Sequence, residues 1–295
     1  MKKSYLKYIA SLVLFGSNGI VASYILLSSV EIVFTRTLIG SLLLILIFIF
    51  SKQKAQFWKN RMHLFYLVVS GVAMGASWMF LYEAYSRIGV SIATLAYYCG
   101  PVIVMILSPI LFKEKMTWIK FGGFLAVLTG MFFVNIHVLS QGGSAWGLAC
   151  GIISAIMYAF MIIFNKKAIS ITGLGNSMCQ LCTSFITVAI FLGLFQGFSI
   201  RLEPGSLLPI LVLGIINTGI GCYFYFSSIG NLPVQTVAIF GYLEPLSALV
   251  FSVVFLGETL DFVQIIGAML ILGGAAFGEL FRRKIKKELF YHSSD

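Results

Sequence analysis

The fold is decided by two stretches of sequence, YCGPVIVMILSPILFKEKMTWIKFGGFLAVLTG at 98–130 and YLEPLSALVFSVVFLGETLDFVQIIGAMLILGG at 242–274. A shift of 144 residues aligns them without a gap. The aligned pairs include Tyr98 with Tyr242, Pro101 with Pro245, and Glu114 with Glu258. Apolar composition alone does not explain paired prolines and glutamates. We therefore predict that the chain contains an internal repeat of 144 residues.

The composition around this repeat excludes a soluble domain. Of the 295 residues, 59% are hydrophobic and only 10% are charged, and the mean hydropathy is +0.99. A soluble domain cannot hide this much apolar surface from water, so the solvent must be lipid. The net charge is +10, but the basic residues sit in short connectors and form no continuous stripe. Nucleic acid is therefore not an expected partner.

Apolar runs of about 20 residues, the length needed to cross a bilayer, predict ten transmembrane helices. They lie near 6–27, 31–50, 63–86, 90–112, 118–138, 146–165, 175–197, 207–229, 233–256 and 262–281. The connectors are short, so consecutive helices should be antiparallel neighbours. The predicted fold class is an all-α integral membrane protein.

The basic residues set the predicted orientation. With the N-terminus in the cytoplasm, the inner connectors and termini hold 17 of the 20 lysines and arginines. The outer side keeps only Arg36, Arg87 and Arg201. By the positive-inside rule both termini are cytoplasmic. The basic tail at 282–295 should then contact anionic membrane lipids.

The repeat and the span count together predict the architecture. The first repeat occupies 1–138 and the second 146–281, and each holds five helices. Because five is odd, the second copy enters the membrane from the opposite side, which makes an inverted repeat. Inverted repeats place a substrate cavity near the bilayer midplane and allow alternating access.

The motifs within the repeat resemble those of the EamA type of the drug/metabolite transporter superfamily. They are LEP at 243–245 with FLGE at 255–258, and GP at 100–101 with LFKE at 111–114. Arg36 also lies where this family often carries an arginine early in the second helix. The resemblance covers nearly the whole chain. It implies a central cavity lined mainly by helices one, three, four, six, eight and nine, with Pro101, Pro245, Glu114 and Glu258 as a structural motif.

Few charged groups fall inside the predicted spans. Each costs roughly 2.5–3.5 kcal/mol in hydrocarbon, so it needs a partner, water or a function. Glu244 lies halfway along the ninth span, immediately before Pro245. The proline can free a backbone carbonyl one turn earlier. Glu244 is therefore predicted to bind substrate or a proton, with a structural hydrogen bond as the alternative.

Three other charges border the spans. Glu83 and Arg87 are four residues apart, the spacing of a helical ion pair, and they form either an interfacial pair or an outer gate. Arg36, whose counterpart in the second repeat is Gln180, is expected to reach the outer headgroups with its long side chain. Alternatively, it neutralises Glu31 or Glu83.

Polar and aromatic residues complete the predicted substrate site. Asn18 lies mid-span in the first helix, where an amide either joins helices or contacts a ligand. Tyrosine hydroxyls at span centres need partners or water. The predicted contacts are Glu244, Asn18, Trp78, Tyr97, Tyr98, Tyr223 and Tyr242, from a wider aromatic set that also includes Tyr82, Tyr158 and Tyr225. Aromatic walls with carboxylates suit an amine or an amino acid.

The predicted function is secondary transport, specifically export of a small metabolite such as an amino acid or amine from a prokaryotic cell. Transport is either proton-coupled through Glu244 or passive, and no phosphate-binding loop that would indicate ATP drive is present in the sequence. The alternative is an intramembrane enzyme acting on a lipid, for which the sequence lacks a metal-binding histidine motif and a readable nucleophile-base pair. We expect no cofactor and no metal, because the five cysteines lie inside apolar spans. Small-residue motifs serve internal packing or a homodimer equally well.

Overall fold

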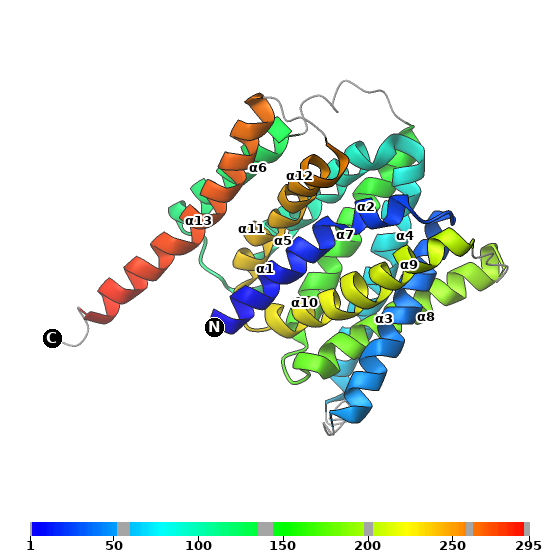
Figure 1. Ribbon diagram of the computed structural model, residues 1–295. Coiled ribbons are helices and arrows are strands. Elements are labelled where there is room, and N and C mark those ends of the chain that lie inside the picture. The colour runs from blue at the N-terminus through cyan, green and yellow to red at the C-terminus, as the bar shows by residue number, and fades with distance from the viewer. Residues whose placement is uncertain (1, 52–59, 135–143, 198–202, 258–261, 292–295) are drawn as a thin grey trace.

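The structure is a computed structural model that describes residues 2–51, 60–134, 144–197, 203–257 and 262–291. These residues form helices and no strand (Figure 1). Seven helical segments among them are long and apolar enough to cross a membrane, and three apolar helices are shorter. The prediction of an all-helical, multi-pass membrane protein is confirmed, and each of the ten segments overlaps one of the ten predicted spans.

The helices of the first half are α1 (Lys2–Gly16), α2 (Asn18–Ser23), α3 (Ser29–Phe50), α4 (Arg61–Tyr97), α5 (Cys99–Phe112) and α6 (Trp118–Val134). Those of the second half are α7 (Ala145–Lys167), α8 (Gly173–Phe195), η2 (Pro204–Ser206), α9 (Leu207–Leu211), η3 (Val212–Ile220), α10 (Gly221–Ile229), α11 (Val234–Gly241), α12 (Leu243–Leu256) and α13 (Phe262–Tyr291). Element η3 is a π-helical segment inside the eighth predicted span.

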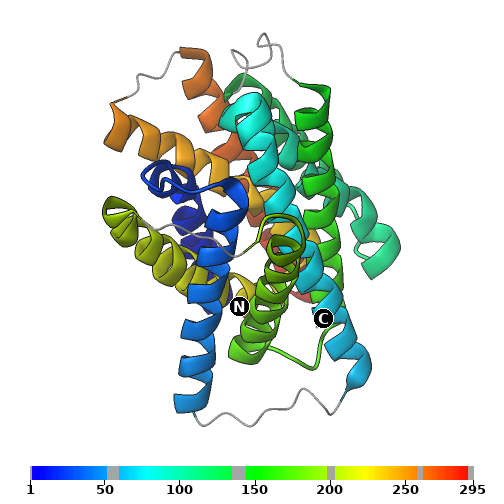
Figure 2. The ribbon, with the colours of Figure 1, turned by 90° about the vertical axis from the view of Figure 1, so that its right-hand side faces the viewer.

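Helix α4 differs most from the sequence prediction, because its 37 residues cover the third span and the beginning of the fourth. Its contacts with α7, which lies beside it in Figure 2, show that the chain turns back within it. In chain order they are Ser70 with Met161, Ser77 with Ser154, Ile88 with Gly147, and Ala96 with Gly151. Along this series the residue numbers on α7 first fall from 161 to 147 and then rise to 151. The chain therefore runs antiparallel to α7 up to Ile88 and parallel to it by Ala96.

Prolines break two of the predicted spans near their middles. Tyr98 separates α4 from α5, and Tyr242 separates α11 from α12. Pro101 and Pro245 each follow the break by three residues. A proline has no N–H, so the carbonyl four residues earlier loses its helical partner. The two repeats are thus interrupted at equivalent positions for the same reason.

Helix α1 is also interrupted. It ends at Gly16, and α2 starts at Asn18 after a turn at Ser17. Gly16 lies so close to α12 that an added Cβ would stand 2.0 Å from the hydroxyl of Ser247. A side chain at this position would push α1 away from α12, so the glycine is needed for the close approach.

The two halves pack with approximate two-fold symmetry. Helices α6 and α13, equivalent in the two repeats, lie side by side at one edge of the molecule (Figure 1). A Cβ on Gly130 would stand 2.5 Å from the carbonyl oxygen of Gly267, and a Cβ on Gly274 would stand 2.6 Å from that of Gly123. These two contacts are related by the 144-residue shift. Helices α3 and α8, which are also equivalent in the two repeats, pack on one another as well.

The small-residue motifs are used mostly inside the chain. Gly71 and Gly75 face α8, and Gly147 and Gly151 face α4. Gly193, in the third motif, lies on the exposed surface of α8. Two of the three motifs therefore join helices of one molecule.

Candidate functional site

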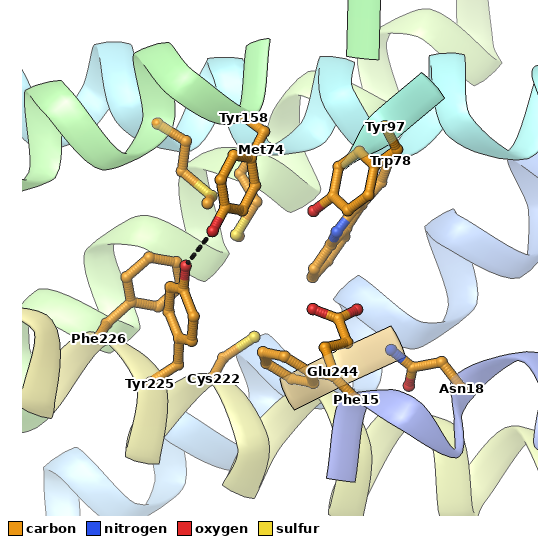
Figure 3. A pocket seen from close by; sticks show the side chains of 11 residues that line it. Phe15, Asn18, Met74, Trp78, Tyr97, Tyr158, Cys222, Tyr225, Phe226 and Glu244 are labelled. Atoms are coloured by element: carbon orange, nitrogen blue, oxygen red, sulfur yellow. Dashed lines mark hydrogen bonds between the residues drawn. The ribbon is translucent and has the colours of Figure 1, made fainter. Parts of the chain in front are cut away.

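A cavity lined by residues of both repeats lies where the two halves meet. Figure 3 shows its lining side chains, which come from α1, α2, α4, α7, α10 and α12. They are Phe15, Asn18, Met74, Trp78, Tyr97, Tyr158, Met161, Cys222, Tyr225, Phe226 and Glu244. The lining is largely aromatic and sulfur-containing, with one carboxylate and one amide.

Glu244 is the acidic residue of this lining. It stands in the first turn of α12, just after the break at Tyr242, and its carboxylate points into the cavity (Figure 3). Within the described part of the chain the carboxylate accepts no hydrogen bond and forms no ion pair. The backbone carbonyl of Glu244, in contrast, accepts a hydrogen bond from the hydroxyl of Ser247 at 2.8 Å. The side chain is thus free to bind a cationic group or a proton.

Aromatic side chains form much of the wall around Glu244. The hydroxyls of Tyr158 and Tyr225 lie 3.2 Å apart, joining α7 to α10 (Figure 3). The ring of Tyr97 meets that of Tyr158 edge to face, with centroids 5.3 Å apart. Tyr8, behind this wall, packs on Tyr225 and donates its hydroxyl to the carbonyl of Val237 at 2.8 Å. The bonded hydroxyls fix the rings and so give the cavity a defined shape.

Asn18 supplies the amide of the lining, and it joins two helices as well. The side-chain amide of Asn217 in η3 donates to the Oδ1 of Asn18 at 2.9 Å and to the hydroxyl of Ser17 at 2.8 Å. It also lies 3.0 Å from the carbonyl of Leu14. The interruption between α1 and α2 is therefore held by Asn217. The two uses predicted for Asn18 are compatible, because one oxygen joins helices and the remaining amide group faces the cavity.

Three predicted contact residues lie outside the cavity lining. Tyr98 and Tyr242 are buried next to one another, and the hydroxyl of Tyr242 donates to the backbone carbonyl of Tyr98 at 2.9 Å. Tyr223 turns toward Lys7, whose ammonium lies 4.7 Å from the ring centroid. Tyr225, two residues further along α10, takes the place in the lining that we predicted for Tyr223.

The expectations for Arg36 were wrong. The side chain does not reach the headgroup region, because it is only 2% exposed. Its Nε donates to the hydroxyl of Thr218 at 2.9 Å, and its Nη1 donates to the hydroxyl of Tyr82 at 3.1 Å. The guanidinium also stacks on Trp78, 4.4 Å from the ring centroid. Among the described residues it pairs with no carboxylate, because polar groups on α4 and η3 hold it inside the bundle.

The two acids proposed as partners of Arg36 are used elsewhere. Glu31 forms a capping box with Ser28 at the start of α3. Glu83 pairs with Arg87, whose Nε lies 2.9 Å from its carboxylate. Both side chains of this pair are substantially exposed, at 34% and 57%. The structure therefore contains the predicted pair, near the end of the part of α4 that runs antiparallel to α7.

Glu114, predicted as part of a structural motif, binds the beginning of α11. Its carboxylate accepts the backbone N–H groups of Val234 at 2.7 Å and Gln235 at 3.1 Å. Lys120 donates to the side chain of Gln235. The negative charge lies where a helix N-terminus presents free N–H groups, so it stabilises α11. Glu258, its counterpart in the second repeat, lies outside the described residues.

Several lining residues were not predicted as contacts. They are Phe15, Met74, Tyr158, Met161, Cys222, Tyr225 and Phe226. Most are apolar, and in a membrane span the lipid-facing side is apolar too, so hydropathy does not separate the two faces. Helical spacing gives a partial signal, because Met74 precedes Trp78 by four residues and Cys222 precedes Phe226 by four.

Both halves of the chain match the same known protein family. The sequence profile described as the EamA-like transporter family matches residues 2–136 and again residues 145–278. The chain belongs to this family. The two matches cover the two halves that meet at the cavity.

Curated relatives of the family resemble this chain over most of its length. An uncharacterised transporter of Bacillus subtilis, YxxF, is 27% identical over 98% of this chain and 93% of its own. An uncharacterised transporter of Helicobacter pylori strain J99 is 29% identical over 83% of each chain. A solved crystal structure superposes with a TM-score of 0.81 at 17% identity, covering 95% of this chain and 98% of that one. This last likeness concerns the fold alone. The protein is thus a multi-pass membrane transporter.

Proposed function

We propose that this transporter is a secondary carrier that exports a small metabolite, an amino acid or an amine, by alternating access through the cavity at Glu244. The observation that carries the proposal is the unpartnered Glu244 carboxylate inside a cavity walled by aromatic rings. A buried carboxylate without a partner is costly, so a bound cation or proton would stabilise it. Aromatic rings attract the same cations through their faces.

The proposed topology follows the sequence prediction. Ten crossings would place both termini in the cytoplasm of a prokaryotic cell, in the inner membrane, with repeats at 1–138 and 146–281 in opposite orientations. The two-fold packing of α6 with α13 supports this arrangement. An inverted repeat can exchange the roles of its halves, and this exchange would open the cavity first to one side and then to the other. A homodimer would use an exposed face such as the one at Gly193.

Coupling to protons is proposed through Glu244, because it is the carboxylate among the described cavity residues. A passive facilitator is the second mechanism, and it needs no titratable group. The intramembrane lipid enzyme is disfavoured by membership in a transporter family.

Uptake by proteoliposomes tests the function. Vesicles with and without the protein would be given a mixture of amino acids, amines, sugars and nucleobases, with and without a pH gradient, and their contents measured by mass spectrometry. We expect amino acids or amines to accumulate only with protein. Accumulation of sugars or nucleobases alone would overturn the proposed substrate class, and no accumulation would overturn the carrier function.

The variant Glu244→Gln separates the two mechanisms, since it keeps the size of the side chain and removes its charge. We expect gradient-driven accumulation to disappear, and exchange without a gradient to weaken, because the variant also removes the proposed site for the cationic group of the solute. Unchanged gradient-driven flux in this variant would overturn proton coupling through Glu244. Glu203→Gln is a suitable control, because Glu203 is exposed and outside the cavity.

A further inference from the structure

Arg36 carries a buried positive charge. Two of its nitrogens are bonded to neutral hydroxyls, and its third, Nη2, is buried with no hydrogen-bond partner. No carboxylate pairs with it among the described residues. A charge inside a membrane protein that forms no ion pair is expensive and usually marks a functional position. A free buried N–H adds a further cost.

Unusual backbone lies beside Arg36. Its partner Thr218 lies in η3, a π-helical segment of nine residues. The hydroxyl of Thr218 in turn donates to the carbonyl of Leu213, five residues earlier. Extended π-helix is rare, and π-bulges occur frequently at functional sites. The guanidinium thus contacts a type of backbone that is common at functional sites.

Arg36 lies immediately behind the wall of the cavity. The ring of Trp78 lines the cavity and carries the guanidinium 4.4 Å from its centroid. Glu244, the acidic residue of the lining, shares this cavity with Trp78. One unpaired anion and one unpaired cation thus lie near the same ring, the anion in the cavity and the cation behind it.

The second repeat shows what a purely structural residue looks like at this position. Gln180, the counterpart of Arg36, is fully buried and donates to the hydroxyl of Ser70 at 2.7 Å. Its carbonyl oxygen accepts from Asn165 at 3.3 Å. Gln180 is neutral, and both ends of its side-chain amide are hydrogen-bonded. Arg36 is charged and keeps a free N–H. Helix packing alone does not require an arginine here.

We propose that the free Nη2 of Arg36 binds the carboxylate of the transported solute while Glu244 binds its ammonium group. The solute is then a zwitterion carrying both groups, and a simple amine satisfies only one of the two charges. Trp78 turns aside to uncover the guanidinium, and the remaining aromatic wall receives the side chain of the solute. This inference rests on the proposed function and assigns Arg36 as its specificity-determining residue.

Binding to the unaltered protein in detergent gives the first test. The probes are leucine, phenylalanine and serine, each with its decarboxylated amine: isopentylamine, phenethylamine and ethanolamine. Affinity is read from the rise in Tm with probe concentration, because a ligand that binds the folded state stabilises it. We expect at least one amino acid to bind at least tenfold more tightly than its amine, since a charge-assisted bond to a buried group is strong.

The variant Arg36→Gln gives the second test. We expect it to weaken binding of that amino acid tenfold or more and not to weaken binding of its amine, because the amine has no carboxylate and loses only a nearby like charge. Arg36→Lys keeps the charge but not the planar geometry, so an intermediate loss is expected. Gln180→Leu is the matched control in the second repeat, and any change it causes should affect the amino acid and the amine equally.

The outcomes separate this inference from the proposed function. If an amine binds as tightly as its parent amino acid to the unaltered protein, the carboxylate site does not exist. An equal loss for both probes in Arg36→Gln would show that Arg36 only holds helices together. If Arg36→Gln does not fold, the comparison on the unaltered protein decides alone. If none of the six probes binds, the proposed amino-acid or amine function fails instead.

Discussion

The hydroxyl of Tyr242 donates to the backbone carbonyl of Tyr98, its own counterpart in the other repeat, at 2.9 Å. The rings lie 6.1 Å apart, and both residues occupy the breaks in their spans. Two residues related by a two-fold operation can touch only near its axis. This bond therefore marks the place where the two halves meet.

Loss of this bond should destabilise the protein. We predict that Tyr242→Phe lowers the free energy of unfolding by about 1–2 kcal/mol, because a buried hydrogen bond is lost. Tyr98→Phe should cost less, since its hydroxyl makes no hydrogen bond among the described residues. Thermal unfolding in detergent measures both. Equal losses would show that the carbonyl bond contributes nothing specific.

The same pair should bias the direction in which the cavity opens. Exchange of the two halves would reverse the bond, so that Tyr98 donates to the carbonyl of Tyr242. We predict that Tyr98→Phe and Tyr242→Phe change the accessibility of the cavity from outside in opposite directions. Cys222, in the cavity lining, is the reporter for an impermeant maleimide, with the other four cysteines replaced. Changes of the same sign would contradict the prediction.

Close packing of α6 on α13 should not tolerate a methyl group. We predict that Gly130→Ala lowers the free energy of unfolding by about 1–3 kcal/mol, because its Cβ would stand 2.5 Å from a backbone oxygen that cannot move alone. Gly122→Ala is the control on the same helix, since its nearest contact would be 3.8 Å away. Thermal unfolding of the two variants measures the difference in stability between them. A Gly130→Ala protein as stable as the control would contradict this packing.

Glu114 should keep the first turn of α11 closed. We predict that Glu114→Ala raises hydrogen exchange in the segment 234–241 and costs about 0.5–2 kcal/mol, as loss of a helix cap does. Glu114→Gln should have a smaller effect, because one acceptor remains. Exchange measured by mass spectrometry reports the segment directly. Glu31→Ala, which removes the capping box of α3, should leave 234–241 unchanged.

The exposed pair Glu83 and Arg87 should matter little for stability. Exposed ion pairs contribute roughly 0–1 kcal/mol, so Glu83→Gln and Arg87→Gln should each change Tm only slightly. Transport separates the two interpretations of the pair. An interfacial pair predicts unchanged flux in both variants, whereas an outer gate predicts altered flux for both. We predict unchanged flux, because the pair is satisfied and exposed.

Much of the fold was predictable from the sequence, because lipid imposes a length and an apolar composition on every crossing segment. The repeat was visible in Pro101, Pro245 and the paired glutamates. The sequence predicted a connector between the third and fourth spans at the point where the chain turns back. It did not predict that helix α4 would continue through this point. Local hydrogen bonding does not reveal a reversal that is set by packing against α7.

The site was predictable where a residue is chemically exceptional in a span. Glu244, Asn18, Trp78 and Tyr97 all line the cavity. Tyr223 and Tyr225 differ by about 200° around a helix, and only the second faces inward. The sequence does not set this phase, because both sides of α10 are apolar or aromatic. The sequence likewise did not place Arg36, whose neutral partners come from segments far along the chain.

The position of Arg36 has a consequence for biosynthesis. Arg36 enters the membrane early, but Thr218 is synthesised 182 residues later. At a translation rate of 5–20 residues per second this is a delay of roughly 10–40 s, during which the arginine lacks one of its hydrogen-bond partners. Until the eighth span has been inserted, the guanidinium therefore makes one hydrogen bond fewer than in the folded protein. A ribosome that stalls between the two halves would leave a nascent chain with an exposed charge, which membrane quality control can recognise.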